Sequence, residues 1–223
     1  MDYQKPSVND RRSTRINYNR LSRWYDILSG SSEKRLSEVG IKTLAPIPGE
    51  RVLEIGAGTG STLPILARAV QPGGMTCGLD LSEGMLSVAR KKLIKASILN
   101  KITLIQADAG ALPYCDNCFD DLFFSFSLEL FSTADMDKVL AESKRVLKPN
   151  GKCCVVAMAD SDSKNLISRV YQWSHRTFPR VIDCRPIWTA EILRQSNFHI
   201  LKTTNLSIWG LPVSIVLAQK ASS

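Results

Sequence analysis

A glycine-rich segment, Gly56-Ala57-Gly58-Thr59-Gly60, follows a short apolar run and precedes a helical pattern. Glycine lets the backbone turn tightly and lets a ligand approach without a Cβ atom in the way. A dinucleotide-binding fingerprint would place another glycine at position 61, where this chain has Ser61. The spacing therefore indicates a nucleotide-type ligand and argues against NAD.

Three acidic residues accompany this segment. Glu54 lies inside the apolar run, where a carboxylate is costly unless it is hydrogen-bonded or faces a wet site. We expect it to face the ligand; hydrogen bonds from nearby backbone amides are the alternative. Asp80 ends the next predicted strand, where a carboxylate can accept both hydroxyls of a ribose. Asp108 follows the third predicted strand, either as a ligand contact or as the cap of a loop.

The elements that would position these residues alternate between strand and helix patterns. Strands are predicted at residues 51–55, 75–80, 102–107, 119–126, 152–158, 198–204 and 207–218. Helices are predicted at residues 33–45, from the glycines to Val70, and at 83–96, 135–147, 163–178 and 188–196. We therefore predict an α/β fold, a Rossmann-like doubly wound sheet of seven mostly parallel strands with an antiparallel C-terminal edge hairpin. Such a sheet binds its ligand at the carboxyl ends of the strands.

Composition supports a cytoplasmic protein that does not span a membrane. With 44% hydrophobic residues among 223, the chain can bury one core as a single domain. Its polar, basic start has no apolar run of the signal-peptide type, and no later stretch is apolar enough to span a bilayer. Cys115 and Cys118 lack the further ligands of a structural zinc site, so we predict no metal.

The net charge of +8 permits attraction to lipid headgroups or nucleic acid, and a solvated basic face is the alternative. Residues 164–180 combine apolar and basic side chains, so this segment could lie on a membrane surface or pack inward. Arg185 is either a clamp for an anionic acceptor or a surface arginine. Peripheral contact with a membrane is thus one expectation, in competition with these plainer roles.

Five blocks occur in order, at Val52–Gly60, Gly78–Leu86, Gln106–Pro113, Phe119–Leu128 and Arg145–Lys152. Together they resemble the class I S-adenosylmethionine-dependent methyltransferases, closest to the group of the ubiquinone/menaquinone C-methyltransferases and related phospholipid N-methyltransferases. The resemblance spans roughly residues 17–158. It implies an enzyme that uses S-adenosylmethionine to methylate a small or lipophilic acceptor, of the quinone-precursor or phospholipid-headgroup type.

The resemblance implies one methyltransferase domain over residues 1–223. Residues 1–45 would form a basic arm and helices that cap the cofactor, and residues 46–158 would form the cofactor-binding core. Residues 159–223 would supply the acceptor-binding insertion and the C-terminal strands.

The same resemblance assigns cofactor-binding roles. Gly56, Gly58 and Gly60 would pass beneath the methionine and ribose portions, Glu54 would lie near the amino group, and Asp80 would hold the ribose hydroxyls.

On the adenine side, Leu81 and Met85 would pack near the ring. Asp108 would accept from the adenine amino group, and the Ala109 amide would address the ring. Ser125 and Phe126 would border the methionine moiety.

Tyr25, together with Tyr18, resembles the tyrosine-bearing helix that caps the cofactor in this family. An aromatic face near a sulfonium contributes about 0.5–2 kcal/mol by cation–π attraction. Packing in the core is the alternative role.

Glu129 is the candidate catalytic residue. Methyl transfer from a sulfonium depends mainly on positioning, and a general base is needed only when the acceptor must lose a proton. Many relatives carry histidines just after the fourth strand, whereas this chain has Leu128-Glu129-Leu130. Glu129 is therefore the nearest base, or an acid without a catalytic task.

Other functions are weighed against this one. The positive charge suits an RNA or protein methyltransferase, but no Asn/Asp-Pro-Pro-Tyr type motif follows the fourth strand, so we expect no nucleic-acid partner. A non-catalytic S-adenosylmethionine-binding module is a further alternative, disfavoured by the intact acids. The identity of the acceptor atom and the oligomeric state are left open by the sequence.

Overall fold

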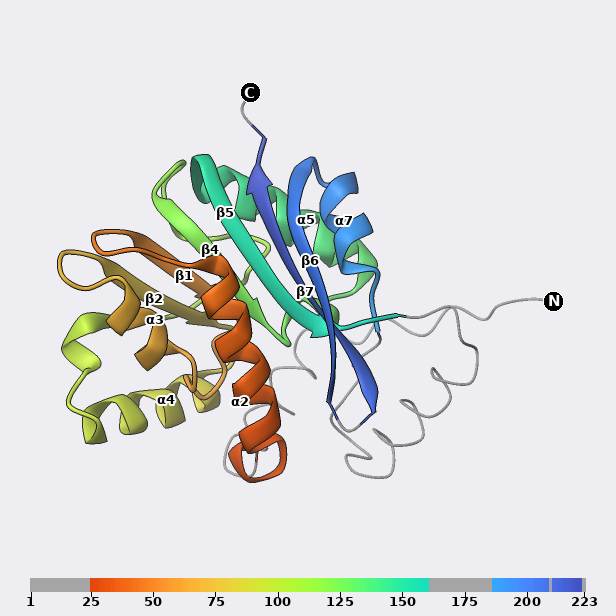
Figure 1. Cartoon of the computed structure of the whole chain (residues 1–223). Helices are drawn as coiled ribbons and strands as arrows, with labels where there is room; N and C mark the ends of the chain where they lie inside the picture. The colour runs from red at the N-terminus through yellow and green to blue at the C-terminus, as the bar shows by residue number, and fades with distance from the viewer. Residues whose placement is uncertain (1–24, 161–185, 209, 222–223) are drawn as a thin grey trace.

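The computed structural model describes residues 25–160, 186–208 and 210–221, with side chains from residue 32 onward (Figure 1). The strands are β1 (Arg51–Ile55), β2 (Met75–Asp80), β3 (Ile102–Gln106), β4 (Phe119–Ser125), β5 (Leu147–Met158), β6 (Phe198–Ile208) and β7 (Leu211–Lys220). The α-helices are α2 (Tyr25–Leu44), α3 (Leu63–Ala69), α4 (Glu83–Lys95), α5 (Thr133–Val146) and α7 (Thr189–Gln195). Two 3-10 turns are η1 (Leu99–Lys101) and η2 (Leu128–Leu130).

The seven strands form one sheet in the order β3-β2-β1-β4-β5-β7-β6. The pairs from β3 to β5 are parallel, whereas β7 runs antiparallel to both β5 and β6. This confirms the predicted Rossmann-like sheet with an antiparallel edge hairpin. The strand order changes direction between β1 and β4, which is the switch point where such sheets bind ligands.

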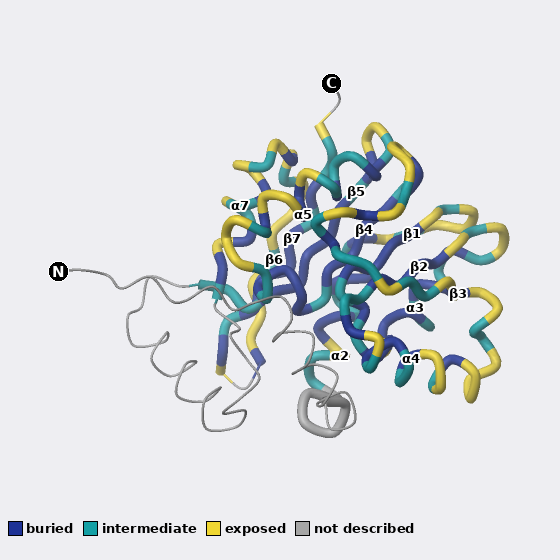
Figure 2. The backbone as a smooth tube through the Cα atoms, turned by 180° about the vertical axis from the view of Figure 1, so that it is seen from behind, coloured by how far each residue is buried: buried dark blue, intermediate teal, exposed yellow. Residues whose placement is uncertain are grey.

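Helices cover both faces of the sheet because successive side chains of each central strand point to opposite faces. Phe123 and Val156 pack with α2 and α3 on one face, and Phe124 and Val155 pack with α5 and α7 on the other. Figure 2 shows the resulting buried layer along the strands, with exposed residues mainly on helix surfaces, in loops, near the amino ends of strands and on the edge strands. Burial on both faces explains why the middle of β4, Leu122 to Phe124, is wholly apolar.

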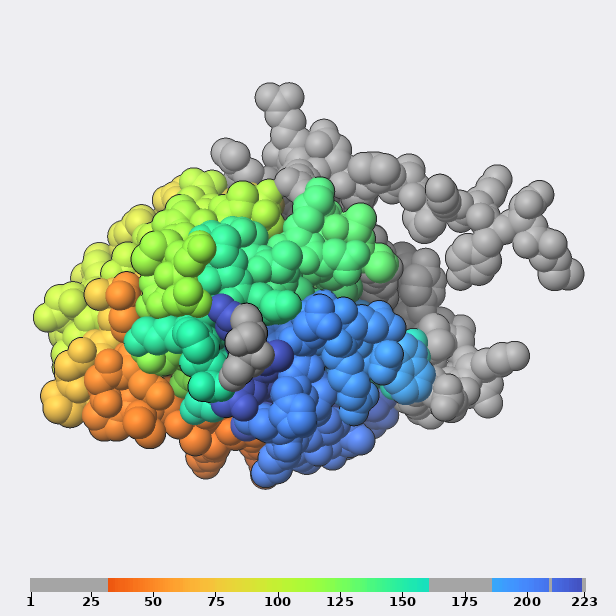
Figure 3. Space-filling view, turned by 90° about the horizontal axis from the view of Figure 1, so that it is seen from above, coloured from red at the N-terminus to blue at the C-terminus, as the bar shows by residue number. Residues whose placement is uncertain are grey.

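The amino and carboxyl edges of the parallel strands differ in what they carry. Seen from above (Figure 3), the start of β5 lies beside the end of β7, where Lys152 pairs with Gln219. Lys220 Nζ donates to the Leu147 carbonyl at 2.6 Å, so the C-terminal strand is fixed at the amino edge of the parallel strands. The opposite edge, where β1, β2 and β4 end, carries the residues singled out in the sequence.

Most element bounds agree with prediction, and three differ. β5 starts at Leu147 instead of residue 152, because Leu147 already pairs with Phe119 of β4. The first helix is longer than predicted, starting at Tyr25 instead of residue 33. The predicted break between the last two strands, at residues 205–206, is wrong: β6 continues to Ile208 and the chain turns at residues 209–210, with Gly210 at φ +79°. Because β6 is an edge strand, its polar Asn205 and Ser207 stay exposed, so their polarity does not mark a turn.

The predicted helix at residues 163–178 lies outside the described residues, as does Arg185. None of the helices within the described ranges is long and apolar enough to cross a membrane.

Candidate active site at the carboxyl ends of the strands

The glycine turn joins β1 to α3 directly beside the end of β2. The amides of Gly56 and Ala57 both donate to the Leu79 carbonyl, at 2.8 and 2.9 Å. Gly56, Gly58 and Gly60 all have positive φ, at +74°, +53° and +73°. The turn therefore needs glycine for its backbone shape, and it is locked against the neighbouring strand.

Space around the turn distinguishes two of these glycines. A Cβ atom on Gly56 would lie 2.5 Å from Ser127 Cβ, so this glycine is required by the packing of the protein itself. A Cβ atom on Gly58 would meet nothing within 4 Å. Gly58 therefore borders open space at the switch point, which is the geometry expected where a ligand lies against the backbone.

Asp80 binds the turn from the end of β2. Its Oδ2 accepts from the Gly58 amide at 2.8 Å, and its Oδ1 accepts from the Ser82 amide at 2.8 Å. Burial raises the pKa of the Asp80 carboxyl, and the amides of Ser82 and Gly58 lower it. Each carboxylate oxygen keeps capacity for a second donor, so the fixed carboxyl can also accept hydroxyl groups.

Glu54 is 1% exposed within β1. Its Oε1 accepts from the Thr62 hydroxyl at the start of α3, whereas its buried Oε2 has no hydrogen-bond partner. Burial raises the pKa of Glu54 to about 8, against the lowering effect of the Thr62 hydrogen bond, and Asp80 raises it further. A buried acceptor atom of this kind is costly to leave unpaired, which suggests that a donor completes the site.

The loop after β3 brings Asp108 and Ala109 to the same edge, because the Ala107 amide donates to the Asp80 carbonyl at 3.2 Å. Asp108 Oδ1 accepts from the Gly110 amide at 2.9 Å, so this side chain does cap its loop. Ala109 is buried. The Leu112 amide donates to Glu142 Oε2 on α5 at 2.7 Å, which fixes the end of this loop.

The start of α4 lies beside Asp80. Ser82 is the N-cap of α4, and its hydroxyl accepts from the Met85 amide at 3.2 Å. Met85 is buried, and Leu81 is half-buried between Asp80 and the cap.

The end of β4 is held by three contacts. The Phe126 amide donates to the Val156 carbonyl at 2.8 Å, and the Ser127 hydroxyl donates to the Ile55 carbonyl at 2.7 Å. Between them Phe126 has φ +50°, an uncommon conformation for a bulky residue that concentrates at functional sites. The Ser125 hydroxyl is 2.7 Å from the Ser37 hydroxyl, which ties α2 to this edge.

Glu129 lies in η2, just past the end of β4, and is 1% exposed. Its Oε1 accepts from the Met158 amide of β5 at 3.2 Å, and its buried Oε2 has no hydrogen-bond partner. Burial raises the pKa of Glu129 to about 7; backbone hydrogen bonds lower it, and the nearby carboxylate of Glu33 on α2 raises it. Its group can therefore exchange a proton near neutral pH.

Three contributors to the site were not singled out from the sequence: Ser37, Thr62 and Ser127. Thr62 could have been suspected, since a buried Glu54 requires a donor and Thr62 follows the glycine turn. Ser37 and Ser127 carry no comparable signal, because each acts through contact with a residue distant in sequence. For Tyr25 the structure gives only its place at the start of α2. Tyr18 lies outside the described residues.

Within the described ranges, no three His, Cys, Asp or Glu side chains gather as a set of metal ligands.

Comparison with known proteins finds a matching family and similar sequences. Residues 52–151 match the family described as "Methyltransferase domain". The ubiquinone/menaquinone biosynthesis C-methyltransferase UbiE of Teredinibacter turnerae is 34% identical over 146 residues, which cover 66% of this chain and 57% of that protein. The chain therefore contains a methyltransferase domain of the class I S-adenosylmethionine-dependent type. The match spans less than two thirds of that relative's own length.

Solved structures share the fold of this methyltransferase at lower identity. The [4+2]-cyclase SpnF superposes with a TM-score of 0.77 at 18% identity, covering 95% of this chain and 97% of that one. A SAM-dependent methyltransferase from Aquifex aeolicus has a TM-score of 0.67 at 22% identity, covering 89% and 97%. Because the first of these proteins is a cyclase by name, the fold alone does not fix the reaction.

Proposed function

We propose that this protein transfers the methyl group of S-adenosylmethionine to a small or lipophilic acceptor, of the quinone-precursor or phospholipid-headgroup type. The observation that carries the proposal is the set of acids at the ends of three adjacent strands. Glu54, Asp80 and Asp108 lie at or just after the carboxyl ends of the adjacent strands β1, β2 and β3, at the edge where Gly58 borders open space. A ribose, an amino group and an adenine need such separate acceptors at neighbouring strand ends.

The residues present suit this cofactor. The unpartnered Oε2 of Glu54 would accept from the amino group, and Asp80 would accept from the ribose hydroxyls. Leu81, Met85, Asp108 and Ala109 would hold the adenine. Ser125 and Phe126 would border the methionine portion, with Tyr25 and the rest of α2 as the cap. The glycine turn, Gly56 to Gly60 with Ala57, would support the cofactor from below.

The acceptor side is supported by an apolar cluster next to Glu129. Phe126 is packed in one cluster with Leu36 of α2, Met158 of β5, and Ile208 and Leu211 beside the β6–β7 turn. Glu129 binds the Met158 amide at this place. One buried carboxyl among apolar side chains suits a lipophilic molecule with a single proton-donating group near the reacting atom.

The C-terminal part of the chain would complete this side. The Ile187 amide donates to the Met158 carbonyl at 3.0 Å, and the Asp160 amide donates to the Ile187 carbonyl at 3.2 Å. Asp160 and Ile187 therefore lie together at the carboxyl end of β5. This supports the proposal that residues 159–223 form the acceptor-binding part of one domain, with residues 46–158 as the cofactor core and residues 1–45 as the cap.

In the proposed reaction S-adenosylmethionine supplies a methyl group already activated on a sulfonium, so the protein's task is mainly alignment. Alignment of this kind contributes about 7–11 kcal/mol. The fixed carboxyls of Asp80 and Glu54 would hold the donor, and the apolar cluster would exclude water. Glu129 Oε2 would accept the proton that the acceptor loses, while the Met158 amide holds the other oxygen in place.

A labelled-transfer assay tests the proposal. Purified protein is incubated with methyl-labelled S-adenosylmethionine and total cell extract, and label is counted separately in organic-soluble, RNA and protein fractions. We expect an organic-soluble product. Asp80→Asn should weaken cofactor affinity about 10–100-fold, since a hydrogen bond to a charged group contributes about 1.5–3 kcal/mol. The exposed Asp137→Asn on α5 is the matched control and should change neither quantity.

Label found only in the RNA or protein fraction would show that the acceptor is a macromolecule and would overturn the proposed acceptor class. Tight cofactor binding by calorimetry without any transfer would instead identify a binding module.

A further inference from the structure

The surface of α4 and the turn after it is strongly basic. From Gly84 to Ala107 the chain has no Asp or Glu. The same stretch contains Arg90, Lys91, Lys92, Lys95 and Lys101. All of these except Lys92 are exposed. This concentration of one sign of charge is denser than the overall net charge of +8 would suggest.

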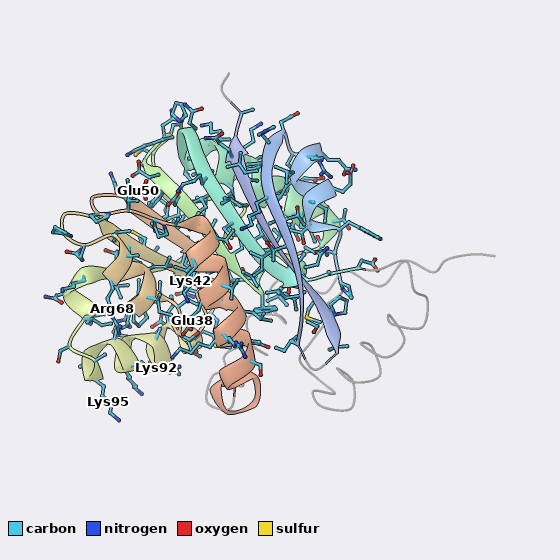
Figure 4. The ribbon with its side chains drawn as sticks, in the orientation of Figure 1. Glu38, Lys42, Glu50, Arg68, Lys92 and Lys95 are labelled. Carbon is cyan, nitrogen blue, oxygen red and sulfur yellow. The ribbon has the colours of Figure 1, made fainter. Side chains whose placement is uncertain are left out.

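An apolar side chain stands among these bases. Ile94 is 58% exposed, and Arg90 and Lys91 lie one turn before it on the same face of the helix. Lys95 follows Ile94 and lies one turn after Lys91. The opposite face of α4 packs inward through Leu86, Ala89 and Leu93, all at most 1% exposed. Figure 2 shows exposed residues along the outer side of α4, and in Figure 4 Lys95 points away from the body of the protein.

Little of this charge is neutralised within the protein. Arg90 Nη1 is 3.6 Å from Glu83 Oε1 at the first turn of the helix, with both side chains about half exposed. Among the residues that the structure describes, Lys91 and Lys95 form no ion pair. The face therefore presents unopposed ammonium groups on both sides of Ile94.

We infer that this face, Arg90, Lys91, Ile94 and Lys95, docks on an anionic lipid bilayer. Bases at a membrane surface are attracted by acidic headgroups, and an apolar side chain between them can enter the acyl boundary. A nucleic acid would engage the bases but would gain nothing from an exposed isoleucine, so the combination favours lipid. The inference rests on the proposed function, because docking would bring the site to the membrane that holds a lipophilic acceptor.

Vesicle sedimentation without cofactor tests the docking face by itself. The full chain is mixed with vesicles of equal parts phosphatidylcholine and phosphatidylglycerol, or of phosphatidylcholine alone. We expect binding to the anionic vesicles only, weakening as salt is raised. Lys91→Gln with Lys95→Gln should weaken it about 25-fold, since each base contributes about 1 kcal/mol near such a surface. Ile94→Ser should weaken it about tenfold, through lost apolar burial.

The matched control is Lys42→Gln with Lys202→Gln, which removes the same charge from exposed positions on α2 and β6. Equal weakening by the control pair would overturn the inference, as would binding to neutral vesicles alone. It would also fall if the α4 variants lost affinity for a non-specific RNA oligonucleotide while keeping vesicle binding. Cofactor binding by calorimetry should be unchanged in every variant. Loss of vesicle binding with transfer to a soluble acceptor intact would therefore separate this face from the proposed reaction.

Discussion

At the amino edge of the sheet the acids of β4 have basic partners, whereas at the carboxyl edge two buried acids have none among the described residues. Asp120 accepts from Lys148 Nζ at 2.6 Å and from the Arg51 amide at 2.9 Å. Asp121, fully buried, has Lys152 Nζ 3.5 Å away. Glu54 and Glu129 each keep one buried oxygen without a hydrogen bond, as do both oxygens of Asp121. The two edges therefore differ in the ammonium group of Lys152 beside Asp121, which has no counterpart beside Glu54 or Glu129 among the described residues.

Burial raises the pKa of Asp121, Glu54 and Glu129 alike, and the three groups differ in the neighbours that oppose this rise. Burial raises the pKa of Asp121 to about 7, and Lys152 lowers it. The raised pKa of Glu54, about 8, is opposed only by a neutral hydroxyl, and that of Glu129, about 7, only by backbone amides. A buried acid with a built-in cation belongs to the scaffold, and one that lacks a cation is available to a ligand.

The largest effect is expected at Glu129. Glu129→Gln keeps the acceptor for the Met158 amide but cannot take a proton, so the rate of methyl transfer should fall about 10²–10⁴-fold with cofactor affinity unchanged. In the wild type, kcat/KM should rise with pH through about 7, as the carboxyl loses its proton. The variant should lack this rise.

Measurement of kcat/KM against pH for both proteins checks this, with the exposed Asp137→Asn on α5 as a carboxyl-to-amide control away from the site. If Glu129→Gln retained full activity and the same pH profile, Glu129 would have only a structural role.

At the amino edge, Asp121→Asn should change stability and leave the site intact. Because the pKa of Asp121 rises from its usual 3.8 to about 7 on folding, the folded state binds the extra proton between these values. The stability that this group contributes is therefore full below about pH 4 and is lost as pH rises through about 7. The variant should lack this loss and become the more stable protein at pH 8.

Denaturant unfolding at pH 4, 6 and 8 measures the difference between the two proteins. If the wild type instead gained stability relative to Asp121→Asn as pH rises, the effect of Lys152 on the pKa of Asp121 would outweigh that of burial. The proposed difference between the two edges would then be wrong.

The sequence predicted those features of the two edges that depend only on the order of residues along the chain. Glycine spacing, Asp80 and the apolar strands indicated the sheet and the cofactor edge, because strand ends of a parallel sheet must meet there. It did not predict that Thr62 serves Glu54 or that Ser37 joins α2 to Ser125, since such contacts depend on how helices sit on the sheet. The strand bounds near Asn205 were missed because an edge strand tolerates polar residues.

Proton release on cofactor binding tests most directly whether Glu54 receives the amino group of S-adenosylmethionine. Glu54, with a pKa of about 8, holds a proton at pH 7 in the free protein. The amino group of S-adenosylmethionine should stabilise the carboxylate and expel that proton. Calorimetry at pH 7 in buffers of different ionisation enthalpy should therefore show release approaching about one proton in the wild type and in Asp121→Asn, and none in Glu54→Gln. Tight binding with no proton release in the wild type would mean that Glu54 does not receive this amino group.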